Sequence, residues 1–154
     1  MKKSIAKHPP TFEEFAATAR RTFGFLESDF GFHESPAKKK YSNPFSVRYE
    51  SPTTIVIVAG IGHGSSASVE LGDPSKQRPD FDVTVPVWTF ASLAGKSISV
   101  VTGNQLEDLP IQAALLRTCA TDVLQGDFSR FATAEKVLDE RIAFLRDEES
   151  KKRG

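Results

Sequence analysis

The amino-acid sequence predicts an α+β fold: an N-terminal helix, an antiparallel β-meander of three to five strands, and a C-terminal αα-hairpin packed on one face of the sheet. Three observations lead to this prediction. An amphipathic helical pattern lies near the N-terminus, closely spaced strand patterns fill the middle, and two helical patterns follow. The 154 residues suffice to bury a core without disulfides or metal. We expect one domain over residues 11–146, between a flexible tail at 1–10 and a charged tail at 147–154.

The N-terminal helix is expected to begin at a capping box, Thr11-Phe12-Glu13-Glu14, in which the threonine hydroxyl and the Glu14 carboxylate satisfy opposite backbone amides. Apolar residues then recur at three- and four-residue steps up to Phe30, and Gly31 follows where a left-handed cap is favoured. Gly24 lies inside the pattern and costs about 1 kcal/mol relative to alanine. We expect one helix from Thr11 to Phe30, because packing of its phenylalanines outweighs that cost.

A loop and three strands are expected next. Residues 31–44 are rich in Ser, Pro, Lys and Asn and predict a loop. Alternating apolar and polar residues indicate strands at 45–50 and 66–71, and the β-branched run at 54–59 indicates a central strand between them. The short connections between these strands predict an antiparallel meander.

The end of the sheet is less regular. Val83, Val85 and Val87 indicate a fourth strand, with Pro86 placing it at a sheet edge or at the start of a short helix that runs through Leu93. Residues 97–101 predict a fifth strand.

Two helical patterns make up the C-terminal hairpin. The first is an apolar stripe from Leu109 to Leu124, with Asn104 or Asp108 as its N-cap, and Gly126 is expected to end it. The second begins at Asp127, and its stripe ends at Leu145 before the charged tail.

Composition excludes several functional classes. The 20 Lys and Arg balance the 20 Asp and Glu, which disfavours nucleic acid or an anionic membrane as a partner. The longest apolar run, 55–61, is far shorter than the roughly 20 residues that span a bilayer. The N-terminus lacks the apolar region of a signal peptide, and the only cysteine, Cys119, fits a reducing compartment. We therefore expect a cytoplasmic protein without a membrane partner.

The glycine-rich segment Gly60-Ile61-Gly62-His63-Gly64-Ser65-Ser66 follows a strand, as dinucleotide-binding loops do. The third glycine of that motif is missing, however, and a strand pattern follows where a helix should begin. The serine is also offset from a nucleophile elbow, which argues against a hydrolase. A hairpin turn is the preferred interpretation. The alternative is a small-anion or nucleotide-binding (or hydrolytic) loop that uses Gly60, Gly62, His63, Gly64 and Ser65.

No catalytic residue, metal site or cofactor is predicted. His8, His33 and His63 show no metal-ligand spacing. Cys119 borders an apolar helical stripe and is expected to be a small buried side chain.

Two loops are candidates for contact with another protein. Asp73, Asp80 and Asp82 form an acidic loop suited to a basic partner, and Lys38, Lys39 and Lys40 with Tyr41 form a basic one. Charge reversal at Asp80 and Asp82 is expected to weaken partner capture and to leave thermal stability nearly unchanged.

Five phrases of the chain resemble a group of small uncharacterised bacterial α+β proteins; they are residues 23–32, 43–49, 85–88, 113–117 and 122–131. That group is similar to immunity proteins encoded near bacterial toxins, and the resemblance implies an inhibitor of a toxin. The leading hypothesis is accordingly a non-catalytic protein-binding module. Homo-oligomerisation through an uncovered helix or sheet edge is a further alternative.

Overall fold

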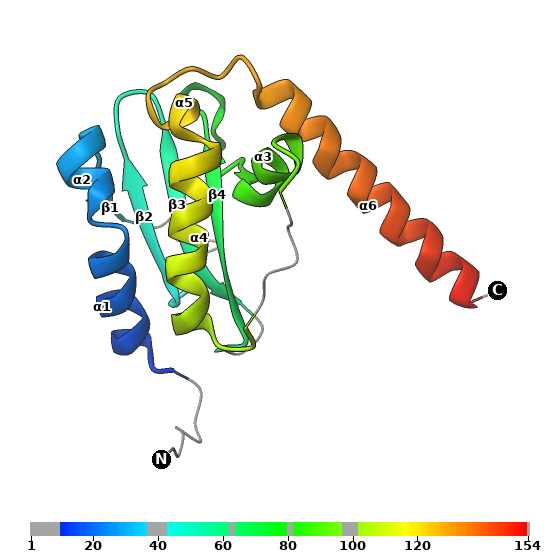
Figure 1. The fold of residues 1–154 in the computed structure, drawn as a ribbon, viewed down its shortest axis with the longest axis horizontal. Coiled ribbons are helices and arrows are strands. Elements are labelled where there is room, and N and C mark those ends of the chain that lie inside the picture. The colour runs from blue at the N-terminus through cyan, green and yellow to red at the C-terminus, as the bar shows by residue number, and fades with distance from the viewer. Residues whose placement is uncertain (1–9, 37–42, 62–63, 80–81, 97–101, 154) are drawn as a thin grey trace.

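The computed structural model describes residues 10–36, 43–61, 64–79, 82–96 and 102–153. Five strands form one antiparallel sheet in the order β1-β2-β3-β4-β5, and helices α1 and α4 pack against it (Figure 1). This arrangement confirms the predicted α+β fold and its meander. Several predicted features lie outside the described residues, namely the tail at 1–9, Lys38–Lys40 with Tyr41, Gly62 with His63, Asp80, and the strand at 97–101.

The N-terminal pattern forms two helices, α1 (Phe12–Thr22) and α2 (Phe25–Phe30), so the prediction of one helix is wrong. The capping box is confirmed: the Thr11 amide donates to Glu14 Oε1 at 2.7 Å. The break falls at Phe23 and Gly24. Residues two apart lie on opposite sides of a continuous helix, yet Phe23 and Phe25 are both buried. Interrupting the helix at the glycine lets both rings enter the core.

The strands are β1 (His33–Ser35), β2 (Ser46–Glu50), β3 (Ile55–Ile61), β4 (Ser66–Gly72) and β5 (Val85–Pro86). The expected loop at 31–44 therefore contains a strand that composition did not indicate. It pairs with β2, and its Glu34 binds Arg20 of α1 at 2.9 Å. The strand predicted around Val83, Val85 and Val87 is β5, which is only two residues long because α3 (Val87–Leu93) begins directly after Pro86. The alternative prediction of a short helix from Pro86 through Leu93 therefore describes most of this segment.

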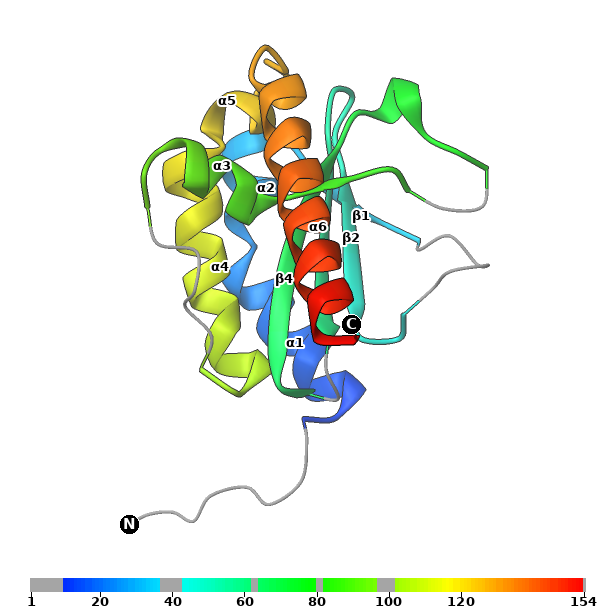
Figure 2. The ribbon, with the colours of Figure 1, turned by 90° about the vertical axis from the view of Figure 1, so that its right-hand side faces the viewer.

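The sheet has one face in the core. Val47, Val58 and Val69 lie side by side across β2, β3 and β4, and all three are buried. Figure 2 shows α1 and α4 on this side of the sheet and the loop between β4 and β5 on the other side. We call the side away from α1 and α4 the outer face. Side chains alternate along each strand, so every second residue of β2, β3 and β4 belongs to it.

The C-terminal helices are α4 (Gln105–Cys119), α5 (Thr121–Leu124) and α6 (Phe131–Arg153). Asn104 caps α4, and its side chain accepts the Leu106 amide at 2.8 Å. The other candidate cap, Asp108, is instead buried and accepts hydrogen bonds from Thr102. Helix α4 packs on the sheet, whereas α6 packs on α3 and β5. Within the described ranges, no helix is long and apolar enough to cross a membrane.

The bounds of the last helix differ from the expected ones. It begins at Phe131 rather than at Asp127, and it continues to Arg153 where a charged tail at 147–154 was expected. Ion pairs one turn apart account for the extension: Lys151 binds Asp147 at 3.3 Å and Arg153 binds Glu149 at 3.2 Å. Basic residues in the last turn also interact favourably with the helix dipole.

The core tyrosine Tyr49 gives a prediction for alkaline pH. Burial, with a smaller contribution from the charge of Glu34, raises the pKa of its phenol to about 12. An unfolded chain ionises tyrosine near pH 10, so above that pH the unfolded state loses a proton that the folded state keeps. Stability is therefore expected to fall by about 1.4 kcal/mol for each pH unit between roughly 10 and 12.

The ionisation can be followed by ultraviolet absorbance. The chain has two tyrosines, so a Tyr41→Phe variant leaves Tyr49 as the one phenol whose ionisation changes the absorbance. A midpoint near pH 10 in the folded protein would contradict the prediction. Replacing Tyr49 by phenylalanine should remove this component of the alkaline loss of stability.

Candidate functional site

The outer face of the sheet carries charged, apolar and small side chains in adjacent rows. Arg48 of β2, Ile57 of β3 and Glu70 of β4 lie opposite one another. The next row is Ser46, Ala59 and Ser68. These rows follow directly from the alternation in each strand, which places polar residues of β2 and β4 away from the core.

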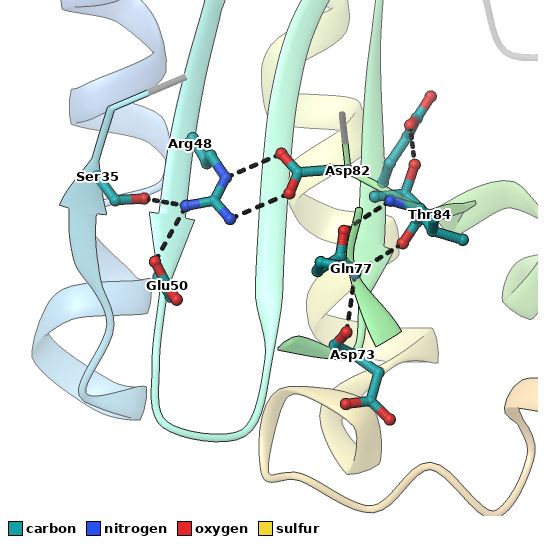
Figure 3. Close-up of polar contacts among 9 residues, drawn as sticks. Ser35, Arg48, Glu50, Asp73, Gln77, Asp82 and Thr84 are labelled. Carbon is teal, nitrogen blue, oxygen red and sulfur yellow. Dashed lines mark hydrogen bonds and ion pairs between the residues drawn. The ribbon is translucent and has the colours of Figure 1, made fainter. Parts of the chain in front are cut away.

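Arg48 organises the polar part of this face (Figure 3). Its guanidinium donates to both carboxylate oxygens of Asp82, at 2.9 and 3.1 Å. It also donates to the Ser35 hydroxyl at 2.7 Å and to Glu50 at 3.0 Å. The exposed fractions of the Arg48 and Asp82 side chains are only 9% and 7%. Burial alone would lower the pKa of Arg48, but its hydrogen bonds to Asp82 and Glu50 outweigh that effect and raise it.

This ion pair anchors the described residues between β4 and β5, 73–79 and 82–84, which we call the crossing loop. Gln77 holds the two limbs of the loop together (Figure 3). Its side-chain amide accepts the Val83 N–H at 2.6 Å and donates to the carbonyls of Val83 and Asp73, at 3.0 and 2.8 Å. Thr84 donates to the Glu70 carboxylate. The crossing loop is thus tied to two strands through side-chain hydrogen bonds.

A groove borders the outer face along β4. Its volume is about 330 Å³, and its lining includes Ser68 and Glu70 from the outer face with Trp88 and Leu115 from the helical layer. The lone tryptophan is half-buried there. The groove extends the outer face at the side where β5 is short.

The predicted partner-binding aspartates have different environments. Asp73 accepts hydrogen bonds from the backbone and hydroxyl of Ser75, which hold the pKa of its carboxyl below the ordinary value. Asp82 is buried against Arg48. The expectation that reversal of its charge leaves stability unchanged is therefore corrected, because a positive side chain at this position would face the Arg48 guanidinium. The partner-binding role of these residues stays a prediction.

The hairpin topology predicted for the glycine-rich segment is confirmed, since β3 and β4 are adjacent antiparallel strands on either side of it. Gly64 has a φ of 94°, which glycine adopts without strain. The Gly60 amide donates to the Phe45 carbonyl at 2.7 Å, and the Gly60 carbonyl accepts a hydrogen bond from the Asn43 side-chain amide at 2.9 Å. Gly60 therefore has no amide free for an anion. Ser65 is exposed, and the anion-binding alternative stays a prediction.

The remaining candidate residues are dispersed. His33 is exposed on β1, and Cys119 is buried at the end of α4, as expected for a small apolar side chain. Throughout the described part of the chain, no three His, Cys, Asp or Glu side chains are grouped so that they could hold a metal ion.

The sequence patterns do not identify four residues of the site as functional: Arg48, Glu50, Ser68 and Glu70. The available signal was the alternation in 45–50 and 66–71, which places these four side chains on the polar face of their strands. Nothing local indicates that Asp82 returns to that face, because 34 residues separate it from Arg48.

The fold and the outer face together define a two-layer α+β protein in which no α-helix of the described residues packs on the outer face. No family model, curated protein or solved structure matches the chain. The resemblance to immunity proteins consequently stays a prediction.

Proposed function

We propose that the protein is a non-catalytic protein-binding module whose contact surface is the outer face of the sheet, with the crossing loop as one wall. The observation that supports this proposal is the Arg48–Asp82 pair, which fixes the crossing loop over a sheet face that no described α-helix covers. Exposed apolar area beside it, at Ile61 and along the groove, offers surface to bury.

Rigidity of the surface favours binding. The Arg48–Asp82 pair and the Gln77 hydrogen bonds hold the crossing loop in one arrangement before any partner arrives. Ordering of loops is one of the main free-energy costs of association. A loop that is already ordered reduces that cost.

The charge of the surface indicates the chemistry of the partner. Arg48 is the one basic residue of β2, β3 and β4, and the carboxylates of Glu50, Glu70 and Asp82 outnumber it, so the sheet floor of the surface has a negative net charge. Complementary potentials speed association and select partners. We propose a protein with a basic patch as the partner.

The resemblance to immunity proteins supports one partner class, a bacterial toxin. A protein that inhibits a toxin by binding to it needs no catalytic group of its own. A rigid, acidic face fits a basic toxin surface electrostatically. We therefore propose a toxin with a basic patch as the specific partner.

A substitution in the middle of the outer face tests the proposed surface. The Ser68 hydroxyl forms no hydrogen bond within the described residues, so Ser68→Arg should leave the fold intact while placing a bulky cation on the floor of the surface. We expect at least about tenfold weaker affinity for the captured partner. Ser92→Arg is the matched control, because Ser92 is exposed on α3. Affinity should be measured by calorimetry with the partner purified after capture from native lysate.

Two outcomes would contradict the proposal. Equal affinities of the Ser68→Arg and Ser92→Arg variants would remove the outer face as the contact surface. Recovery of a bound nucleotide or small anion with no protein partner would instead favour the glycine-rich loop, and Gly62→Val or His63→Ala should then abolish that binding.

A further inference from the structure

Helix α6 carries large apolar side chains that the described part of the chain leaves exposed. Its N-terminal half is attached, since Ala134 is fully buried and α6 packs on α3 and β5. Beyond that contact the helix projects away from the domain (Figure 1). Ile142 and Leu145 are 38% and 50% exposed. Large apolar side chains gathered on one exposed helix indicate an interface.

The spacing of these residues is that of a helix-pairing seam. Leu138, Ile142 and Leu145 follow one another at steps of four and three, as do the d, a and d positions of a heptad. In this frame, Asp139 and Arg146 occupy e positions, and Arg141 and Glu148 occupy g positions. All four charged residues flank the apolar seam, where they would face a partner helix.

The flanking charges select both the partner and its direction. In an antiparallel pair of identical helices, e faces e and g faces g. Asp139 of one copy then meets Arg146 of the other, and Arg141 meets Glu148. Two-fold symmetry repeats both contacts, which gives four pairs of opposite charge. A parallel pair would place g beside e and bring Arg141 against Arg146 twice.

Little within the chain competes for these charges. Asp139, Arg141 and Arg146 form no ion pair in the described part of the molecule, although Arg141 stacks on the Phe144 ring 5.6 Å away. Glu148 has a 3.7 Å contact with Lys151. The side chains that would meet across the two-fold axis are therefore mostly available.

From this complementarity we infer that the C-terminal half of α6 pairs with α6 of a second copy of the chain, antiparallel, to form a homodimer. Leu145 of one copy packs beside Ile142 of the other, and the four charge pairs border this contact. The dimer surface is separate from the outer face, so the inference goes beyond the proposed function and does not depend on it.

Charge swaps test the inference. The full chain is measured by sedimentation equilibrium over a roughly hundredfold range of concentration, because dimerisation depends on concentration. Arg146→Asp and Asp139→Arg each place like charges together twice and should weaken the dimer at least about tenfold. An equimolar mixture of the two variants restores opposite charges at every such contact, so it should form a heterodimer with wild-type affinity. Glu140→Arg reverses a charge at an outward position and should leave the dimer unchanged.

The alternatives give different results. A wild-type chain that remains monomeric at every concentration would overturn the inference. Tighter self-association of Arg146→Asp would also overturn it, because that substitution relieves the Arg141–Arg146 repulsion of a parallel pair. Failure of the mixed variants to associate would show that Asp139 and Arg146 do not meet. Circular dichroism establishes that each variant remains folded.

Discussion

Asp82→Ala is expected to lower the free energy of unfolding by about 3 kcal/mol, because it leaves the Arg48 guanidinium buried without the carboxylate that binds it in bidentate fashion. Glu50 and Ser35 still accept hydrogen bonds from Arg48, which keeps the loss at the lower end for a broken buried pair. For a domain of this size, the thermal midpoint should fall by roughly 6–12 °C. Calorimetric or circular-dichroism melting at neutral pH measures the effect.

A matched variant and a double-mutant cycle separate this cause from general damage to the crossing loop. Asp73→Ala removes a carboxylate from the same loop, but one that only caps a short turn, so it should cost about 1 kcal/mol. In an Arg48→Met background, Asp82→Ala should cost much less than it does alone. An equal cost in both backgrounds would show that Asp82 stabilises the loop through contacts other than Arg48.

Features set by neighbouring residues were predictable from sequence, and long-range features were not. The capping box at Thr11 and the strand alternation at 45–50 depend on short-range geometry, and both are confirmed. The break between α1 and α2 depends on which rings the core accepts. Helical spacing alone could not reveal that Phe23 and Phe25 would both be buried.

In the candidate site too, only the features set by neighbouring residues were predictable from sequence. Alternation places Arg48 and Glu50 on the polar side of β2, so their shared face was predictable. The charge of the acidic residues in the crossing loop predicts contact with an external partner. In the fold, Asp82 instead binds Arg48 across the outer face. Only the tertiary arrangement distinguishes a carboxylate that meets an internal guanidinium from one available to a partner.

Phe90→Ala is expected to have the largest effect on stability, about 4 kcal/mol, because it removes a fully buried ring and leaves a cavity. The ring joins two parts of the fold. The Phe131 ring at the start of α6 lies 6.0 Å away, and the Arg130 guanidinium lies 5.3 Å from the centre of the Phe90 ring. The thermal midpoint should fall by roughly 8–16 °C. Chemical denaturation monitored by circular dichroism measures the free energy directly.

Phe144→Ala makes the same chemical change on the exposed half of α6 and should shift the stability of the monomer by no more than about 0.5 kcal/mol. Because Phe90 contacts the beginning of α6, its loss should also release that helix locally. Exchange of the Ala134 amide should then accelerate more than that of the Ala19 amide in α1. Equal acceleration at both amides would mean that α6 stays docked until the whole domain unfolds. In that case the contacts of α6 with β5, rather than the Phe90 ring, hold the helix in place.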